Sequence, residues 1–270
     1  MVGVPVVSKR LASIASTPEE KEALKQLNWD NLLNPMLIGF SDGEALRELQ
    51  QAFANSTAEG QRITQQLLTS NDIYRGNSDG RGRWSNKARE SLMMENFDYY
   101  VNGYEGELPP MFFKFGAYHL HRGKSPRVEK ALGLHIDEWA KQRQKQTVNV
   151  LVDVQKGQTI DPLLGTTTES GDNTWEEAIF KDYLLDSQAT LFDLGPLKNR
   201  PEKKEMSNGI AHMLNGYDYL ILFKSGSAQN YMPGTLVAYG YGIPIAIIAL
   251  LLFVLLIFGI VKVVRHIRKK

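Results

Sequence analysis

The chain has 270 residues and no cysteine. Disulfides, thiolate nucleophiles and cysteine metal sites are therefore excluded, and the redox compartment stays undetermined. The zinc-protease pattern HExxH, the serine-hydrolase pattern GxSxG and the phosphate-binding loop are also missing. None of the five histidines precedes His119. The sequence predicts no metal ion and no cofactor.

Positive charge is not in excess outside the C-terminal tail. The formal net charge is +1, but without the five basic residues of the tail 26 Lys and Arg face 30 Asp and Glu. Nucleic-acid binding needs a concentrated basic surface, so nucleic acid is excluded as a partner. The tail itself is suited to contact anionic lipid.

Charge is also absent from Ser225 to Val261, and residues 243–261 read IPIAIIALLLFVLLIFGIV. At roughly 1.5 Å per residue, this run spans about 28 Å, close to the hydrocarbon thickness of a bilayer. The alternative is a buried core helix, but such helices usually keep a polar face. The sequence therefore predicts a single transmembrane helix with the lipid bilayer as a partner.

Charge asymmetry predicts the orientation of this helix. Lys262, Arg265 and the residues after them follow it, whereas no Lys or Arg lies between Lys224 and the helix. This bias places the C-terminus in the cytoplasm and the main domain in a periplasm or extracellular space. The first residues, however, lack the apolar region of a signal peptide. Either the native chain begins upstream of Met1, or the protein is tail-anchored with its domain in the cytosol.

The body divides into a helical part and an α/β part. Thr17 and Glu20 form a capping-box pattern, and apolar spacing near 3.6 continues to about residue 69. Helices then alternate with short apolar strands, predicted at 108–116, 148–154, 189–194 and 217–223. The fold class is α/β: a helical N-terminal region, then a partial parallel or mixed sheet flanked by helices. The predicted segments are a helical region at 1–74, a loop at 75–84, the α/β region at 85–224, a linker at 225–242, the transmembrane helix at 243–261 and the basic tail at 262–270.

Chemically versatile side chains are densest at residues 114–124, KFGAYHLHRGK, where a predicted strand passes into a loop. Ligands of open α/β sheets gather at the carboxyl ends of strands. His119 is the candidate acid, base or ligand, and Lys114, Tyr118 and His121 are candidate pocket residues. The competing interpretation is that these histidines cap a loop and meet solvent.

The helix predicted before this cluster contains Arg89, Glu90, Met93 and Asn96, with Arg89, Met93 and Asn96 on one face. Followed by a strand and Gly-x-x-His, this pattern resembles the erythromycin esterase family. That family has a helix motif R-D-x-x-M-A-x-N and then a strand ending in W-A-H-N-x-H. Glu90 occupies the position of the Asp in the helix motif, and His119 occupies the position of the final histidine in the strand motif. The resemblance covers roughly residues 85–224.

The resemblance implies an ester or lactone hydrolase in which His119 binds or polarises the carbonyl. It also implies that Arg89 pairs with an acidic partner and shapes the pocket. Lys114 and Gly116, however, stand where the family has Trp and its first His, and the family's general base comes from an N-terminal half not seen here. The chain therefore resembles the C-terminal half only, and we expect it to be incomplete or inactive as a hydrolase.

A second hypothesis is a non-enzymatic, membrane-anchored domain that binds a hydrophobic ligand or a partner protein. A structural component of a membrane complex is a third. The sequence does not fix the oligomeric state.

Overall fold

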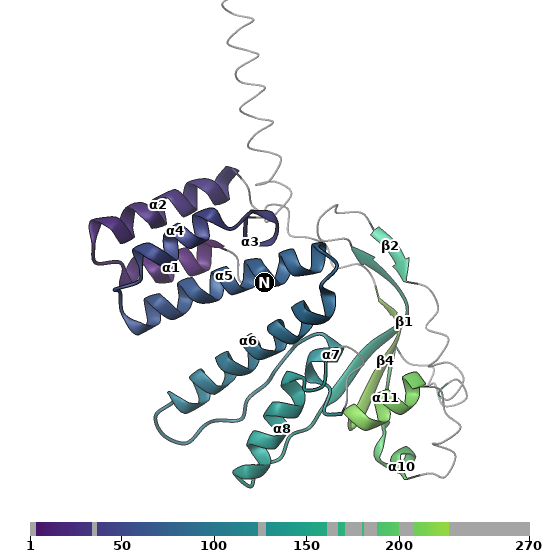
Figure 1. Ribbon diagram of the computed structural model, residues 1–270. Helices are drawn as coiled ribbons and strands as arrows, with labels where there is room; N and C mark the ends of the chain where they lie inside the picture. The colour runs from purple at the N-terminus through teal and green to yellow at the C-terminus, as the bar shows by residue number, and fades with distance from the viewer. Residues whose placement is uncertain are drawn as a thin grey trace, which may run out of the picture. The chain divides into compact units, whose positions relative to one another are not determined.

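A computed structural model describes residues 4–33, 37–123, 128–160, 167–170, 180, 188–199 and 208–226. These residues fall into two compact units, which divide within one helix, between Leu68 and Thr69. The first unit is helical, and the second contains the sheet (Figure 1). All the predicted site residues belong to the second unit.

The helices of the first unit agree with the predicted helical region. They are α1 (Val4–Ile14), α2 (Pro18–Leu33), α3 (Leu37–Phe40), α4 (Glu44–Ala52) and the first part of α5 (Ala58–Ser78). The capping box is confirmed: Thr17 Oγ1 accepts from the N–H of Glu20 at 3.1 Å, and Glu20 Oε2 accepts from the N–H of Thr17 at 2.9 Å. Leu11, Leu27, Leu46, Leu49 and Phe53 form the buried interior of this unit.

A tight turn joins α5 to α6 (Gly82–Asn102). Gly80 has φ 76°, Arg81 donates to the carbonyl of Gly76 at 2.8 Å, and Gly80 donates to that of Asn77 at 3.3 Å. This pair of bonds is a Schellman motif, in which a left-handed glycine satisfies the last carbonyls of the helix. The Gly-rich run predicted as a loop at 75–84 is therefore mostly helical, and only 79–81 lie between the helices.

The second unit packs α6 against α8 (Leu132–Gln142). The ring of Phe97 meets the rings of Trp139 and His135 edge-on, at centroid distances of 5.4 and 5.8 Å. His135 Nε2 also lies 2.8 Å from Asp98 Oδ1. His135 and Trp139 of α8 therefore pack against α6.

The sheet is mixed and has the order β2-β1-β4-β3. β1 (Val150–Ile160) runs parallel to β4 (Tyr219–Gly226), whereas β2 (Thr167–Ser170) and β3 (Ala189–Asp193) are antiparallel to their neighbours. The strands predicted at 148–154, 189–194 and 217–223 correspond to β1, β3 and β4. Residues 156–160 are the end of β1 and 167–170 form β2, whereas 161–166 lie outside the described residues.

One face of the sheet is covered and the other is exposed. Helix α11 (Asn208–Gly216) and the strands share one buried hydrophobic cluster. The helix contributes Ile210, Met213 and Leu214, and the strands contribute Leu151, Leu220 and Leu222. Short helix α10 (Gly195–Lys198) follows β3. On the other face, Val152 and Leu191 are 57% and 63% exposed.

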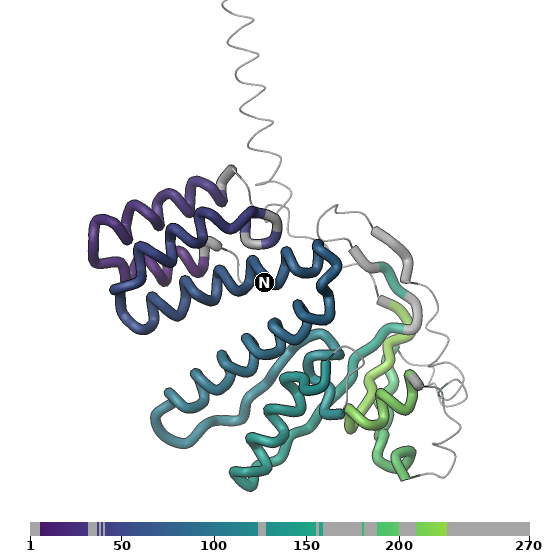
Figure 2. Tube along the Cα trace, in the orientation of Figure 1, coloured from purple at the N-terminus to yellow at the C-terminus, as the bar shows by residue number. Residues whose placement is uncertain are grey.

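The strand predicted at 108–116 is wrong. This segment has no regular secondary structure, and it returns along α6 and α8 to α7 (Ala117–Leu120) (Figure 2). Phe113 packs on Phe97 at a centroid distance of 5.9 Å, while Phe112 is 91% exposed. No backbone hydrogen bond links residues 110–115 to the rest of the described chain. A strand requires a paired neighbour, and this apolar run has none among the described residues.

The prediction of a single-pass membrane protein is also corrected. Across the described ranges, no helix combines the length and the apolar character that crossing a membrane requires. The segments on which the prediction relied, 225–242, 243–261 and 262–270, lie outside the described residues except for Ser225 and Gly226.

Candidate functional site: a carboxylate–histidine pocket

The turn Gly116–Gly123 carries the predicted site residues Tyr118, His119 and His121, and it is held by hydrogen bonds to distant elements. The hydroxyl of Tyr217 donates to the carbonyl of Ala117. Burial, reinforced by the nearby Tyr118, raises the pKa of Tyr217, so its hydroxyl keeps its proton and remains a donor. Asn149 Nδ2 donates to the carbonyl of Leu120 at 2.6 Å. Both ends of α7 are therefore fixed.

A close backbone approach adds a third constraint on this turn. A Cβ atom on Gly133, in the first turn of α8, would lie 2.0 Å from the carbonyl oxygen of Leu120. No side chain fits there, so only glycine lets α8 come this close to α7. The turn is clamped between α8 and the sheet before any ligand arrives.

His121 is part of this clamp. It is fully buried and stacks on His212 with a centroid distance of 3.7 Å. Its Nε2–H donates to the carbonyl of His212 at 2.8 Å, and its Nδ1 accepts from the N–H of Gly123 at 2.9 Å. These partners require the neutral Nε2–H tautomer. His121 does not line the pocket, and the geometry gives it a structural role.

Arg122 completes the clamp through two carboxylates. Its guanidinium forms ion pairs with Asp218 and, at 3.6 Å, with Asp137. Burial alone would raise the pKa of Asp218, but the N–H of Asn149 and the guanidinium of Arg122 outweigh it and hold that pKa below its ordinary value. The sequence analysis missed Asp137 and Asp218, because nothing local marks residues so far from Arg122 as its partners.

The central interaction of the site joins Glu90 of α6 to His119 of α7. Glu90 Oε1 is hydrogen-bonded to His119 Nδ1, and Glu90 Oε2 accepts from the N–H of Leu132 at 2.9 Å. Glu90 is only 3% exposed. Since both carboxylate oxygens are engaged, the charge of Glu90 is directed at His119 and at the start of α8. The helix dipole there also favours a negative charge.

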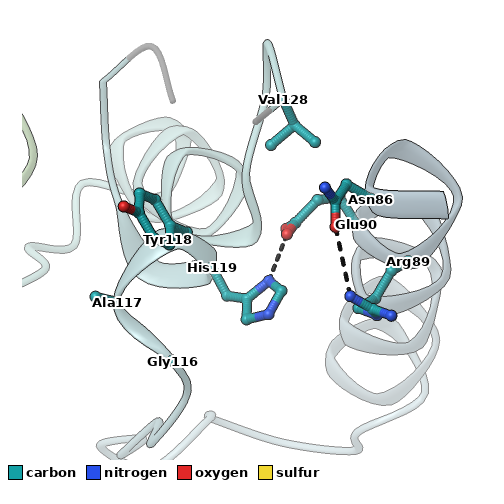
Figure 3. Close-up of a pocket in the computed structure, with 8 residues that line it drawn as sticks. All are labelled: Asn86, Arg89, Glu90, Gly116, Ala117, Tyr118, His119 and Val128. Carbon is teal, nitrogen blue, oxygen red and sulfur yellow. Dashed lines mark hydrogen bonds and ion pairs between the residues drawn. The ribbon is translucent and has the colours of Figure 1, made fainter. Parts of the chain in front are cut away.

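The Glu90–His119 pair forms one side of a small pocket of about 180 Å³ (Figure 3). With its Nδ1 bound to Glu90, His119 has only Nε2 left for a ligand. The residues that line the pocket are Asn86, Arg89, Glu90, Gly116, Ala117, Tyr118, His119 and Val128. Arg89, Glu90, Tyr118 and His119 were predicted site residues, so the structure brings four of the six together.

Arg89 does not make the acidic pair that the family resemblance implies. Its Nη1 donates to Asn86 Oδ1 at 3.4 Å, and its guanidinium lies 5.8 Å from the centroid of the Tyr74 ring. No carboxylate within the described ranges forms an ion pair with it. Asn86 was missed, although its place one turn before Glu90 on the same helix face could have indicated it.

The remaining motif residues lie elsewhere. Lys114 is exposed and is not part of the pocket lining. Met93 packs beside the cluster between α6 and α8, and Asn96 Nδ2 donates to the carbonyl of Leu92 at 2.9 Å. Of the three residues on the predicted helix face, only Arg89 reaches the pocket. In the described part of the chain, no group of three His, Asp or Glu side chains is arranged to hold a metal ion.

Comparisons with protein-family models, with curated proteins and with solved structures give no match for this chain. The resemblance to the erythromycin esterase family therefore stays a prediction.

Proposed function

We propose that this pocket binds the carbonyl group of an ester or lactone, as the carbonyl-binding part of a hydrolase of the erythromycin esterase type. The observation that carries the proposal is the Glu90–His119 pair at the pocket wall. A buried carboxylate that holds one ring nitrogen of a histidine fixes the orientation of the ring.

The chemistry follows from the free ring nitrogen. In the imidazolium form, Nε2–H donates a hydrogen bond to the carbonyl oxygen, and this bond strengthens as negative charge develops there. In the neutral form, with the proton on Nδ1 beside Glu90, Nε2 accepts a proton instead. The clamped turn presents this group without a rearrangement on binding.

Hydrolysis also requires a base that activates water. The described lining contains one histidine and one carboxylate, and these are already paired with each other. We therefore expect this chain to bind esters and lactones without efficient turnover. This pairing of the histidine and the carboxylate in the described lining also favours a second candidate, a small-ligand binding site without catalysis.

Saturation-transfer NMR with δ-valerolactone tests binding, and release of 4-nitrophenol from 4-nitrophenyl acetate tests turnover. We expect lactone binding by the full chain to be lost in His119→Gln and retained in His135→Gln. His135 is the matched control because it also pairs with a carboxylate, Asp98, but lies outside the pocket. Equal binding by both variants would overturn the proposal. His119-dependent ester cleavage would instead show a complete catalytic site.

A further inference from the structure

We infer that the ligand of this pocket is anionic, and that Arg89 recognises a carboxylate or similar group next to the reacting carbonyl. This inference rests on the proposed function and specifies its substrate class. It begins with the charges that line the pocket.

The negative charge of the pocket, on Glu90, is already hydrogen-bonded to groups of the protein. Glu90 has one oxygen on His119 Nδ1 and the other on the N–H of Leu132, and it is almost fully buried. A ligand entering the pocket meets the imidazole of His119 rather than the carboxylate. Among the described residues that line the pocket, no other side chain is acidic.

The positive charge of the pocket is not used. Arg89 is half-buried, and within the described part of the chain its contacts are a long hydrogen bond to an amide oxygen and the face of an aromatic ring. Neither contact neutralises a guanidinium, and neither occupies its paired N–H donors. A guanidinium with free donors matches a carboxylate in both geometry and charge.

Arg89 and His119 lie close enough to act on one small molecule. Figure 3 shows the two side chains extending from facing elements, α6 and α7, into the same space. The volume of about 180 Å³ lies below the usual range for drug-sized ligands, so the pocket suits a small group. The geometry thus accommodates a carbonyl at Nε2 of His119 with an anionic substituent at Arg89.

Two esters with the same succinyl backbone separate this inference from a neutral alternative: monomethyl succinate, which carries a carboxylate, and dimethyl succinate, which does not. We expect the full chain to bind the monoester at least about tenfold more tightly, as a charge-assisted hydrogen bond would give. Only the monoester should bind more weakly as ionic strength rises. Saturation-transfer titrations measure both affinities.

Arg89→Gln should remove most of this preference, and Arg89→Lys should retain part of it because the charge remains. Arg143→Gln is the matched control, since Arg143 also lies over an aromatic ring, that of Trp139, but outside the pocket. Thermal unfolding of each variant checks that the fold is kept. Equal affinity for both esters in the unaltered chain, or a preference unchanged in Arg89→Gln, would overturn the inference.

The result also separates this inference from the proposed function. If succinate, which has no ester group, binds as tightly as the monoester and His119→Gln changes neither affinity, the carbonyl-binding function fails while the anion specificity stands. If both esters bind equally and both depend on His119, the function stands and the anion specificity fails.

Discussion

Glu90 is the residue on which the geometry of the pocket depends most. It holds His119 with one oxygen and the N–H of Leu132 with the other, so it joins α6, α7 and α8 through one buried carboxylate. Removing one partner from a buried, charge-assisted hydrogen bond costs more than the bond contributes, because the remaining group is left without a partner.

Glu90→Gln should therefore lower the free energy of unfolding by about 1–3 kcal/mol, measured by urea denaturation. Asp98→Asn is the control, since Asp98 also binds a histidine but has a side chain that is 42% exposed. The control should cost less than about 1 kcal/mol. The central position of Glu90 would be contradicted if both variants cost the same.

The sequence identified the residue types of the site better than their connections. Arg89, Glu90 and His119 follow from one short helix motif and one Gly-x-x-His pattern, both local. The bond from Leu132 to Glu90 and the ion pair between Arg122 and Asp218 join residues 42 and 96 positions apart. Such contacts depend on how elements pack, and no local pattern specifies them.

Among the elements, α7 shows most clearly how packing fixes the site. Its four residues cannot form a stable helix alone. Their position comes from the hydroxyl of Tyr217, the amide of Asn149 and the close contact with Gly133.

Gly133→Ala should accordingly destabilise the protein by about 1–3 kcal/mol, because the new methyl group overlaps the Leu120 backbone. We expect it to weaken lactone binding as well, since it displaces the turn that carries His119. Gly82→Ala, at the first residue of α6, is the matched helical control, because its Cβ would have only Asn77 Oδ1 nearby, at 3.9 Å. Thermal unfolding should show a change of less than about 1 kcal/mol for the control. Equal losses for the two variants would contradict the close-approach explanation.

The segment before α7 allows a test with neighbouring residues. Phe113→Ser should cost about 2 kcal/mol or more, because Phe113 packs on Phe97. Phe112→Ser should leave the free energy of unfolding almost unchanged, because Phe112 is exposed. Urea denaturation of the two variants measures the difference. A larger loss of unfolding free energy for Phe112→Ser than for Phe113→Ser would contradict the exposed position of Phe112.

The error at this segment has a physical cause. Met-Phe-Phe-Lys-Phe has strong β propensity, but strands form by pairing, and propensity is secondary to the available neighbours. The runs that became β3 and β4 are similar in composition and do pair, with each other. The Schellman turn after α5 is the opposite case, in which a polar, Gly-rich run that resembles a loop continues as a helix up to its glycine cap.

At the scale of the whole molecule, the division into two units separates the site from the N-terminal helices. The first unit contains the capping box of α2. There, the N–H groups of Thr17 and Ser16 lower the pKa of Glu20 from 4.5 to about 2. A carboxylate with a lowered pKa stabilises the folded form above its ordinary pKa, and this stabilisation is lost as the pH falls toward the folded value.

We therefore expect the helices of the first unit to lose protection against hydrogen exchange as the pH falls from about 4.5 to about 2. In Glu20→Gln, that loss should already be present at neutral pH and should change less on acidification. Glu19→Gln, which alters the exposed neighbour, is the control and should behave like the unaltered chain. An identical acid profile for Glu20→Gln would contradict the role assigned to this cap.

The central claim, that Glu90 orients His119 so that Nε2 meets a carbonyl, is tested most directly by ¹⁵N NMR of the histidine side chains. In the neutral form, the proton of His119 should lie on Nδ1. Addition of monomethyl succinate should shift the Nε2 resonance of His119 while leaving that of His135 unchanged. A proton on Nε2 in the neutral form, or an Nε2 resonance that no ester or lactone shifts, would contradict the account.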